Sequence, residues 1–141
     1  MKADQNHIAI RLEGFSCSPE ELTEKIGLKP TWVALKNQEY HIGTADNRIT
    51  KKYKTNCWQF RVDKEDQSWV SDQVREFLEE HIRPRKKQIK QVVSSCEGEL
   101  SIVHYIFEGC NPGLHFGKEE IELLSETGLE LDIDIYCLAA D

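Results

Sequence analysis

The chain has 141 residues, and its 18 basic and 25 acidic side chains give a formal net charge of −7. This length fits one domain with a substantial core, and the acidic balance argues against a general nucleic-acid-binding protein, which needs a basic surface. No run of about 18 apolar residues occurs, so the sequence predicts no membrane span. The five cysteines form no C-x-x-C pair, and the first residues lack a secretion signal. We therefore expect one cytoplasmic domain over residues 1–141, without a metal or other cofactor.

The N-terminal part predicts a strand, a short helix and a second strand. Residues 7–13 alternate apolar and polar side chains, as a half-buried strand does. Ser18 is a good N-cap, Pro19 suits the first helical position, and Glu21 can close a capping box. The helix should end at Gly27, and residues 31–35 have the composition of a strand.

Residues 36–56 have no clear periodicity and predict a long basic loop, with room for a short hairpin. Aromatic side chains and positive charge occur together in and beside this segment, a combination that suits an anionic ligand or a protein partner. A solvated insertion without a ligand is the equally weighted alternative. The residues of this candidate ligand or partner surface are Trp32, Tyr40, His41, Arg48 and Tyr53.

The second half of the chain continues the alternation of strands and helices. Residues 57–62 predict a strand with Trp58 inside and Arg61 outside. An amphipathic helix follows from Val70 and is interrupted by Pro84. After it we expect a strand over 100–107, a weak strand near Leu114, and a helix that carries Ile121 and Leu124 and stops at Gly128. The final strand should point five side chains inward: Leu129, Leu131, Ile133, Ile135 and Cys137.

This order predicts an α+β fold. We expect a two-layer sandwich in which a mainly antiparallel sheet carries helices on one face. The helix that ends at Gly27 and the helix that ends at Gly128 each follow a strand and a turn. That repetition suggests a ferredoxin-like arrangement with duplicated split βαβ units.

Several of these signals together resemble one known family, the bacterial domain-of-unknown-function family 4279. The resemblance covers about residues 7–138 and implies an α+β fold, but it implies no substrate, cofactor or catalytic residue. The residues that carry it are Ser18-Pro19-Glu20-Glu21-Leu22, Gly27-Leu28-Lys29-Pro30, Trp58, Pro84, Pro112-Gly113-Leu114, Gly128-Leu129 and Leu131-Asp132-Ile133-Asp134-Ile135-Tyr136.

Two groups of residues outside the loop could form a catalytic or cation-binding site. Cys17 lies beside a helix N-terminus, which favours a thiolate, but no histidine spacing supplies a base, so a turn residue is the better interpretation. Asp132 and Asp134 share one face of the last strand and could form an acid–base or cation site. Cross-strand ion pairs with Arg11 and Arg61 are the favoured interpretation.

Two further patterns have simple structural interpretations. The arginines and lysines around Pro84 could bind phosphate, but they fit the solvated side of a helix better. A mixed metal site can be drawn from Cys96, His104, Cys110 and His115, although their spacing does not require one.

No phosphate-binding loop, dinucleotide fingerprint, zinc-protease motif or nucleophile elbow occurs, which argues against an enzyme without deciding the question. We therefore predict a non-enzymatic protein-interaction module whose acidic surface binds a basic protein partner, as an immunity protein would. Self-association through the sheet is a further prediction. The alternative function is a small anionic-ligand binder or enzyme that uses residues 36–56.

Overall fold

The computed structural model describes residues 5–64, 68–107 and 112–138 of the chain. Its main sheet consists of β1 (His7–Glu13), β2 (Trp32–Ala34), β5 (Cys57–Asp63), β6 (Glu97–Phe107) and β7 (Glu130–Leu138). The strand order is β2-β5-β1-β6-β7. Only β6 and β7 are parallel neighbours, and the other adjacent pairs are antiparallel.

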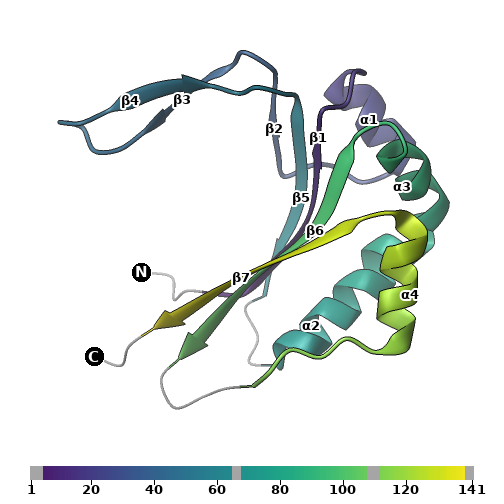
Figure 1. Cartoon of the computed structure of the whole chain (residues 1–141). Helices are drawn as coiled ribbons and strands as arrows, with labels where there is room; N and C mark the ends of the chain where they lie inside the picture. The colour runs from purple at the N-terminus through teal and green to yellow at the C-terminus, as the bar shows by residue number, and fades with distance from the viewer. Residues whose placement is uncertain (1–4, 65–67, 108–111, 139–141) are drawn as a thin grey trace.

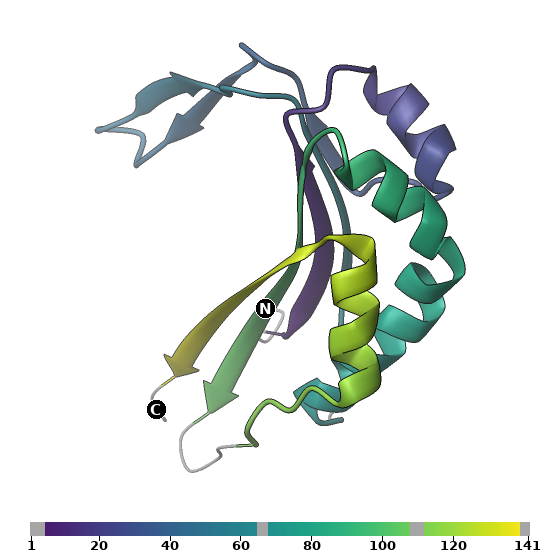
Figure 2. The same ribbon diagram turned by 45° about the vertical axis from the view of Figure 1, so that its right-hand side comes forward.

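All helices lie on one side of this sheet (Figures 1 and 2). They are α1 (Pro19–Ile26), α2 (Val70–Phe77), α3 (Lys86–Val93) and α4 (Lys118–Thr127). The predicted α+β class and two-layer sandwich are therefore confirmed. The first βαβ unit is split, because β5 lies between β1 and β2, whereas the strands of the second unit, β6 and β7, are direct neighbours.

The chain changes helical geometry between α2 and α3, at the predicted proline. A π-helical turn, Leu78–Ile82, leads into a 3₁₀ turn, Arg83–Arg85, before α3 begins. Pro84 has no N–H to donate, and its ring clashes with the preceding turn, so a regular α-helix cannot run through it. The bend lets both helices follow the curved sheet (Figure 2).

The core lies between the helices and one face of the sheet. Ile8, Ile10 and Leu12 of β1 are buried, and the register places them level with Val62, Phe60 and Trp58 of β5 and with Ile102, Leu100 and Gly98 of β6. This alternation confirms the period-two pattern of the first strand. Trp58 is inside and Arg61 outside, as predicted.

The predicted N-cap, first-turn proline and terminal glycine of the first helix are present. The hydroxyl of Ser18 accepts the backbone N–H of Glu21 at 3.1 Å, and Pro19 is the first helical residue. Gly27 ends the helix with a φ of 81°, a left-handed conformation that glycine adopts without strain.

Residues 36–56 contain the short hairpin for which the sequence leaves room, formed by β3 (Glu39–Ile42) and β4 (Ile49–Lys52). Two other expectations about local structure need correction. No strand forms at Leu114, since residues 112–117 have no regular structure. Leu131, Ile135 and Cys137 of the last strand are exposed rather than buried, because β7 is the edge strand of the sheet. The end of β7 that carries Ile135 and Cys137 also extends past the helices (Figure 1).

Candidate functional site

The hairpin of β3 and β4 projects from the sheet on the side away from the helices (Figures 1 and 2). We call residues 36–56 the arm. Backbone bonds anchor its base: the N–H of Asn37 donates to the carbonyl of Tyr53 at 2.8 Å, and that of Tyr53 donates to the carbonyl of Gln38 at 3.0 Å. The side chain of Asn56 accepts the N–H of Lys36 at 2.9 Å.

Three of the five predicted surface residues come together where the arm leaves the sheet. The ring centroids of Trp32 and Tyr53 are 5.6 Å apart, and those of Tyr53 and Tyr40 are 4.5 Å apart. These distances are typical of favourable aromatic contacts. Lys51 is the register partner of Tyr40, so one cationic side chain lies on the same face as the rings.

His41 and Arg48 do not join this aromatic group. Nδ1 of His41 lies 3.0 Å from the hydroxyl of its register partner Thr50, and this pair occupies the opposite face of the hairpin. Arg48 is exposed and precedes β4, near the tip of the arm. The five residues therefore do not form a single site.

The second candidate surface is the face of the sheet that the helices do not cover, which we call the open face. One row of side chains crosses all five strands, because Trp32, Gln59, Arg11, Glu99 and Glu130 are successive register partners. The open face carries acidic side chains along its length, with only two arginines among them. Its charged residues are Arg11, Glu13, Arg61, Asp63, Glu97, Glu99, Glu130, Asp132 and Asp134.

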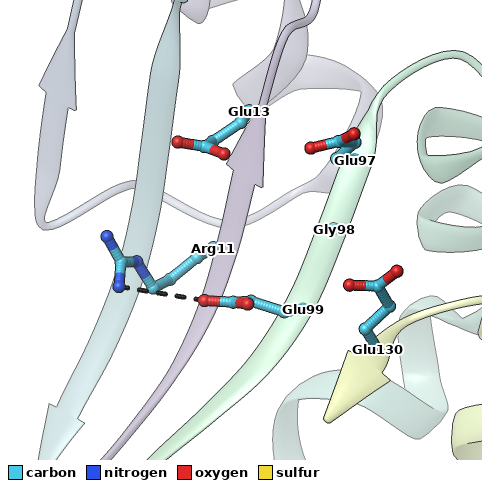
Figure 3. A pocket seen from close by; sticks show the side chains of 6 residues that line it. All are labelled: Arg11, Glu13, Glu97, Gly98, Glu99 and Glu130. Atoms are coloured by element: carbon cyan, nitrogen blue, oxygen red, sulfur yellow. Dashed lines mark ion pairs between the residues drawn. The ribbon is translucent and has the colours of Figure 1, made fainter. Parts of the chain in front are cut away.

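At one end of the open face, four glutamates line a pocket of about 240 Å³ (Figure 3). Glu13 lies directly opposite Glu97 in the register, and Glu99 lies directly opposite Glu130. Like charges in directly opposed positions destabilise a sheet. Among the described residues that line it there is a single cation, Arg11, whose Nη1 lies 3.8 Å from Oε1 of Glu99.

The electrostatics of the pocket disfavour a further negative charge. Burial raises the pKa of the Glu99 carboxyl, and the charges of Asp132, Glu13 and Glu130 raise it further against the opposing effect of Arg11. A group with this environment is stabilised by any cation that enters the pocket. The arrangement is thus suited to bind a lysine or arginine side chain.

Glu99→Gln is expected to raise the melting temperature by about 1–3 °C near neutral pH, because the substitution removes one of several crowded charges. A carboxyl whose pKa is raised by folding destabilises the folded protein at pH values above that pKa. This cost disappears as the pH falls below the pKa that the carboxyl has in the unfolded chain. The increase in melting temperature should therefore vanish at about pH 4. Differential scanning calorimetry at both pH values measures it, with exposed Glu24→Gln as the control. A lower melting temperature at neutral pH would contradict this prediction.

The predicted ion pairs of Asp132 and Asp134 are wrong. Arg11 pairs with Glu99 instead, and Nε of Arg61 lies 2.7 Å from Asp63 on its own strand. Among the residues that the structure describes, neither aspartate has an ion-pair partner. Both carboxylates therefore extend the acidic surface away from the pocket.

The basic cluster around Pro84 joins helices to one another. Arg83 pairs with Glu79 at 2.8 Å on the same helical segment, and Lys86 pairs with Glu126 of α4. Nε of Arg85 donates to the carbonyl of Gly27 at 3.2 Å, at the end of α1. These contacts agree with a structural role.

The described histidines and cysteines that the sequence offered as ligands or nucleophiles do not form a cluster. No group of three metal-ligating side chains occurs among the described residues, and Cys110 lies outside them. His104 is buried, and its Nδ1 lies 3.1 Å from Oδ1 of Asn6. Cys17 is partly buried against the core, and burial raises the pKa of Cys96.

The sequence pattern missed the acidic pocket. Glu13 ends the strand predicted over residues 7–13, whereas Glu97 precedes the strand predicted over residues 100–107. Nothing in either segment indicates that the two glutamates face one another. Only an excess of glutamate on the polar faces of several strands could have pointed to this surface.

A family model described as "Domain of unknown function (DUF4279)" matches residues 4–138, nearly the whole chain. No curated protein and no solved structure matches the chain. In the described parts of the chain, no helix is long and apolar enough to cross a bilayer.

Proposed function

Since the chain belongs to the DUF4279 family, a domain of unknown function, we propose a function from its own surface: it is a protein-interaction module that binds a basic partner surface on the open face. Two pairs of opposed carboxylates, Glu13–Glu97 and Glu99–Glu130, support this function most strongly. Repulsion between the opposed carboxylates destabilises the free protein, and a cationic partner placed between them would be attracted to all four.

The remainder of the open face extends the same chemistry. Asp132 and Asp134 continue the acidic surface along β7, where Tyr105 and Tyr136 stack with ring centroids 5.3 Å apart. Aromatic side chains next to charge are typical of protein-binding surfaces. An immunity protein that neutralises a basic toxin is one form of this function, and the four free cysteines of the described chain fit a reducing cytoplasm.

Octalysine with a fluorescent label tests the proposed function as a probe of lysine-rich protein surfaces. We expect binding at about 50 mM salt that weakens strongly at about 500 mM, because exposed charges are screened. The triple variant Glu99→Gln, Glu130→Gln, Asp132→Asn should weaken binding at least about tenfold, since it removes three carboxylates from the open face. Fluorescence anisotropy measures both effects.

A matched triple variant separates the open face from net charge. Glu20→Gln, Glu24→Gln, Glu122→Gln removes three exposed carboxylates from α1 and α4, in the helix layer. It should bind octalysine as the wild type does. Equal weakening in both triple variants, or no binding at all, would overturn the proposed function.

A second candidate function is an anionic-ligand site on the arm, which the aromatic group of Trp32, Tyr53 and Tyr40 beside Lys51 favours. Labelled octaglutamate is the opposite probe in the same titration. Binding of octaglutamate without binding of octalysine would replace the first function with the second.

A further inference from the structure

The arm has an amphipathic face that nothing in the described structure covers. Register pairing and alternation place Tyr40, Ile42, Ile49, Lys51 and Tyr53 on one side of the hairpin. Ile42 and Ile49 face each other across the strands and are 40% and 53% exposed. Within residues 5–64, 68–107 and 112–138, β3 and β4 pair only with each other, so no third strand from these ranges supports the hairpin. A two-stranded hairpin alone in water is marginally stable.

Charge is strongly segregated between the arm and the rest of the molecule. Residues 36–56 hold five basic and two acidic side chains, a net charge of +3, so the remaining chain carries −10. The open face has seven carboxylates against Arg11 and Arg61. The arm and the open face are therefore electrostatically complementary.

The two surfaces join at Trp32. This residue belongs to the row of side chains that crosses the open face, and its ring also contacts Tyr53 of the arm. One continuous surface thus runs from a basic, apolar arm to an acidic sheet whose far end carries Tyr105, Tyr136 and Phe107.

A surface with opposite charge at its two ends is self-complementary under a two-fold axis. In such an arrangement each end meets the opposite end of the second copy, and the same contact forms twice. The arm is long enough, because about eight residues at roughly 3.3 Å each exceed the roughly 19 Å across five strands.

The free edge of β7 offers a less favourable route to self-association. Glu130, Asp132 and Asp134 occupy alternate positions on this strand. An antiparallel pair of two β7 edges would set carboxylates opposite carboxylates, which is how natural edge strands avoid pairing. Contact through the arm avoids this repulsion.

We propose that the chain forms a two-fold dimer in which the arm of each copy lies across the acidic open face of the other. Lys51 then faces the carboxylates of β7, and Ile42 and Ile49 leave water. This inference rests on the proposed function, because the second copy is one basic partner of the open face.

Sedimentation velocity of the full chain at about 100 µM tests the dimer. We expect a dimer at about 50 mM salt whose dissociation constant rises at least about tenfold at about 500 mM. The arm variant Lys51→Glu and the face variant Asp132→Lys, Asp134→Lys should each be monomeric. Circular dichroism checks that both remain folded.

Mixing the two variants is the decisive measurement. In the mixed dimer, the reversed arm meets the reversed face while the other contact keeps its native charges, so a heterodimer should form. The control variant Glu20→Lys, Glu24→Lys makes the same charge change as the face variant, but on α1. It should dimerise as the wild type does. A monomeric wild type, variants that still dimerise, or a mixture that stays monomeric would overturn the inference.

The octalysine titration distinguishes failure of the proposed dimer from failure of the proposed function. If the wild type is monomeric but binds octalysine on the open face, the dimer is wrong and the proposed function stands. If the chain neither dimerises nor binds octalysine, both are wrong.

Discussion

Trp58→Ala is expected to lower the free energy of unfolding by about 3–5 kcal/mol, the usual cost of removing a large buried aromatic side chain. Trp58 is 1% exposed and lies on the core face of β5. Its indole N–H donates to the hydroxyl of Thr23 at 3.2 Å, which joins β5 to α1. The alanine variant loses the ring contacts and this hydrogen bond together. Urea unfolding should show a lower midpoint at an unchanged slope.

Two smaller substitutions divide this loss between the ring and the hydrogen bond. Trp58→Phe keeps most of the buried ring, and Thr23→Val leaves the indole N–H without its acceptor, so each should cost about 1–2 kcal/mol. Trp69→Ala is the control, because Trp69 is exposed and should contribute less than about 0.5 kcal/mol. A loss below about 1 kcal/mol for Trp58→Ala would contradict this account of the core.

Elements whose signals are local could be predicted from the sequence. The cap at Ser18 and the interruption at Pro84 depend on backbone groups within one helical turn, so the sequence around them is sufficient. The inward position of Trp58 follows from alternation within its own strand. The α+β class follows from the order of these elements.

Features that depend on register between distant strands could not be predicted. Alternation indicates that Arg11 and Asp132 both face solvent, but only the register shows that Arg11 lies opposite Glu99. Burial depends on the second layer in the same way. Ile135 is on the helix side of β7, yet it is exposed because the strand extends beyond the helices.

The candidate surface on the arm was predicted only in part, because it also depends on how strands pair. Trp32, Tyr40 and Tyr53 belong to one aromatic group, but their contact needs the hairpin that brings β3 beside β4. The composition of residues 36–56 indicated a partner surface without indicating its pairing. Arg48 lies apart because pairing begins only after it, at Ile49.

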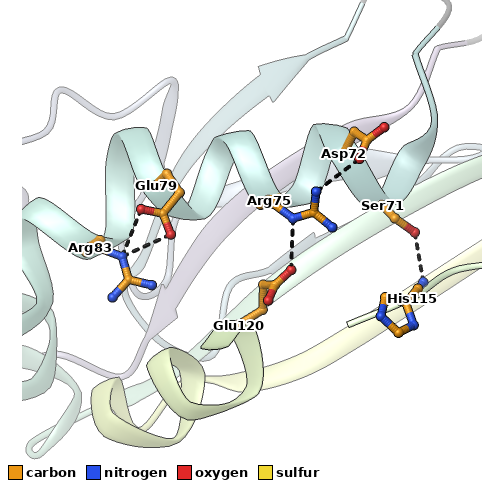
Figure 4. Close-up of polar contacts among 7 residues, drawn as sticks. All are labelled: Ser71, Asp72, Arg75, Glu79, Arg83, His115 and Glu120. Carbon is orange, nitrogen blue, oxygen red and sulfur yellow. Dashed lines mark hydrogen bonds and ion pairs between the residues drawn. The ribbon is translucent and has the colours of Figure 1, made fainter. Parts of the chain in front are cut away.

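Glu120→Ala is expected to lower the free energy of unfolding by about 2–4 kcal/mol near neutral pH. Glu120 is buried in the first turn of α4, the helix that leads into β7, and its Oε1 accepts Nε of Arg75 at 3.1 Å (Figure 4). Burial acts to raise the pKa of this carboxyl. The Arg75 bond and the backbone N–H groups of Gly117 and Glu120 outweigh burial, so the pKa lies below its ordinary value.

The charge of Glu120 should make this stabilisation depend on pH. A carboxylate whose pKa is lowered by folding stabilises the folded protein fully at pH values above its pKa in the unfolded chain, ordinarily 4.5. This stabilisation is lost as the pH falls through the lower pKa of the folded protein. The difference between the wild type and the isosteric Glu120→Gln should therefore shrink between about pH 7 and about pH 3 in urea unfolding. Exposed Glu122→Ala on the same helix should change little at either pH. An equal difference at both pH values would mean that packing, rather than charge, holds α4 against α2.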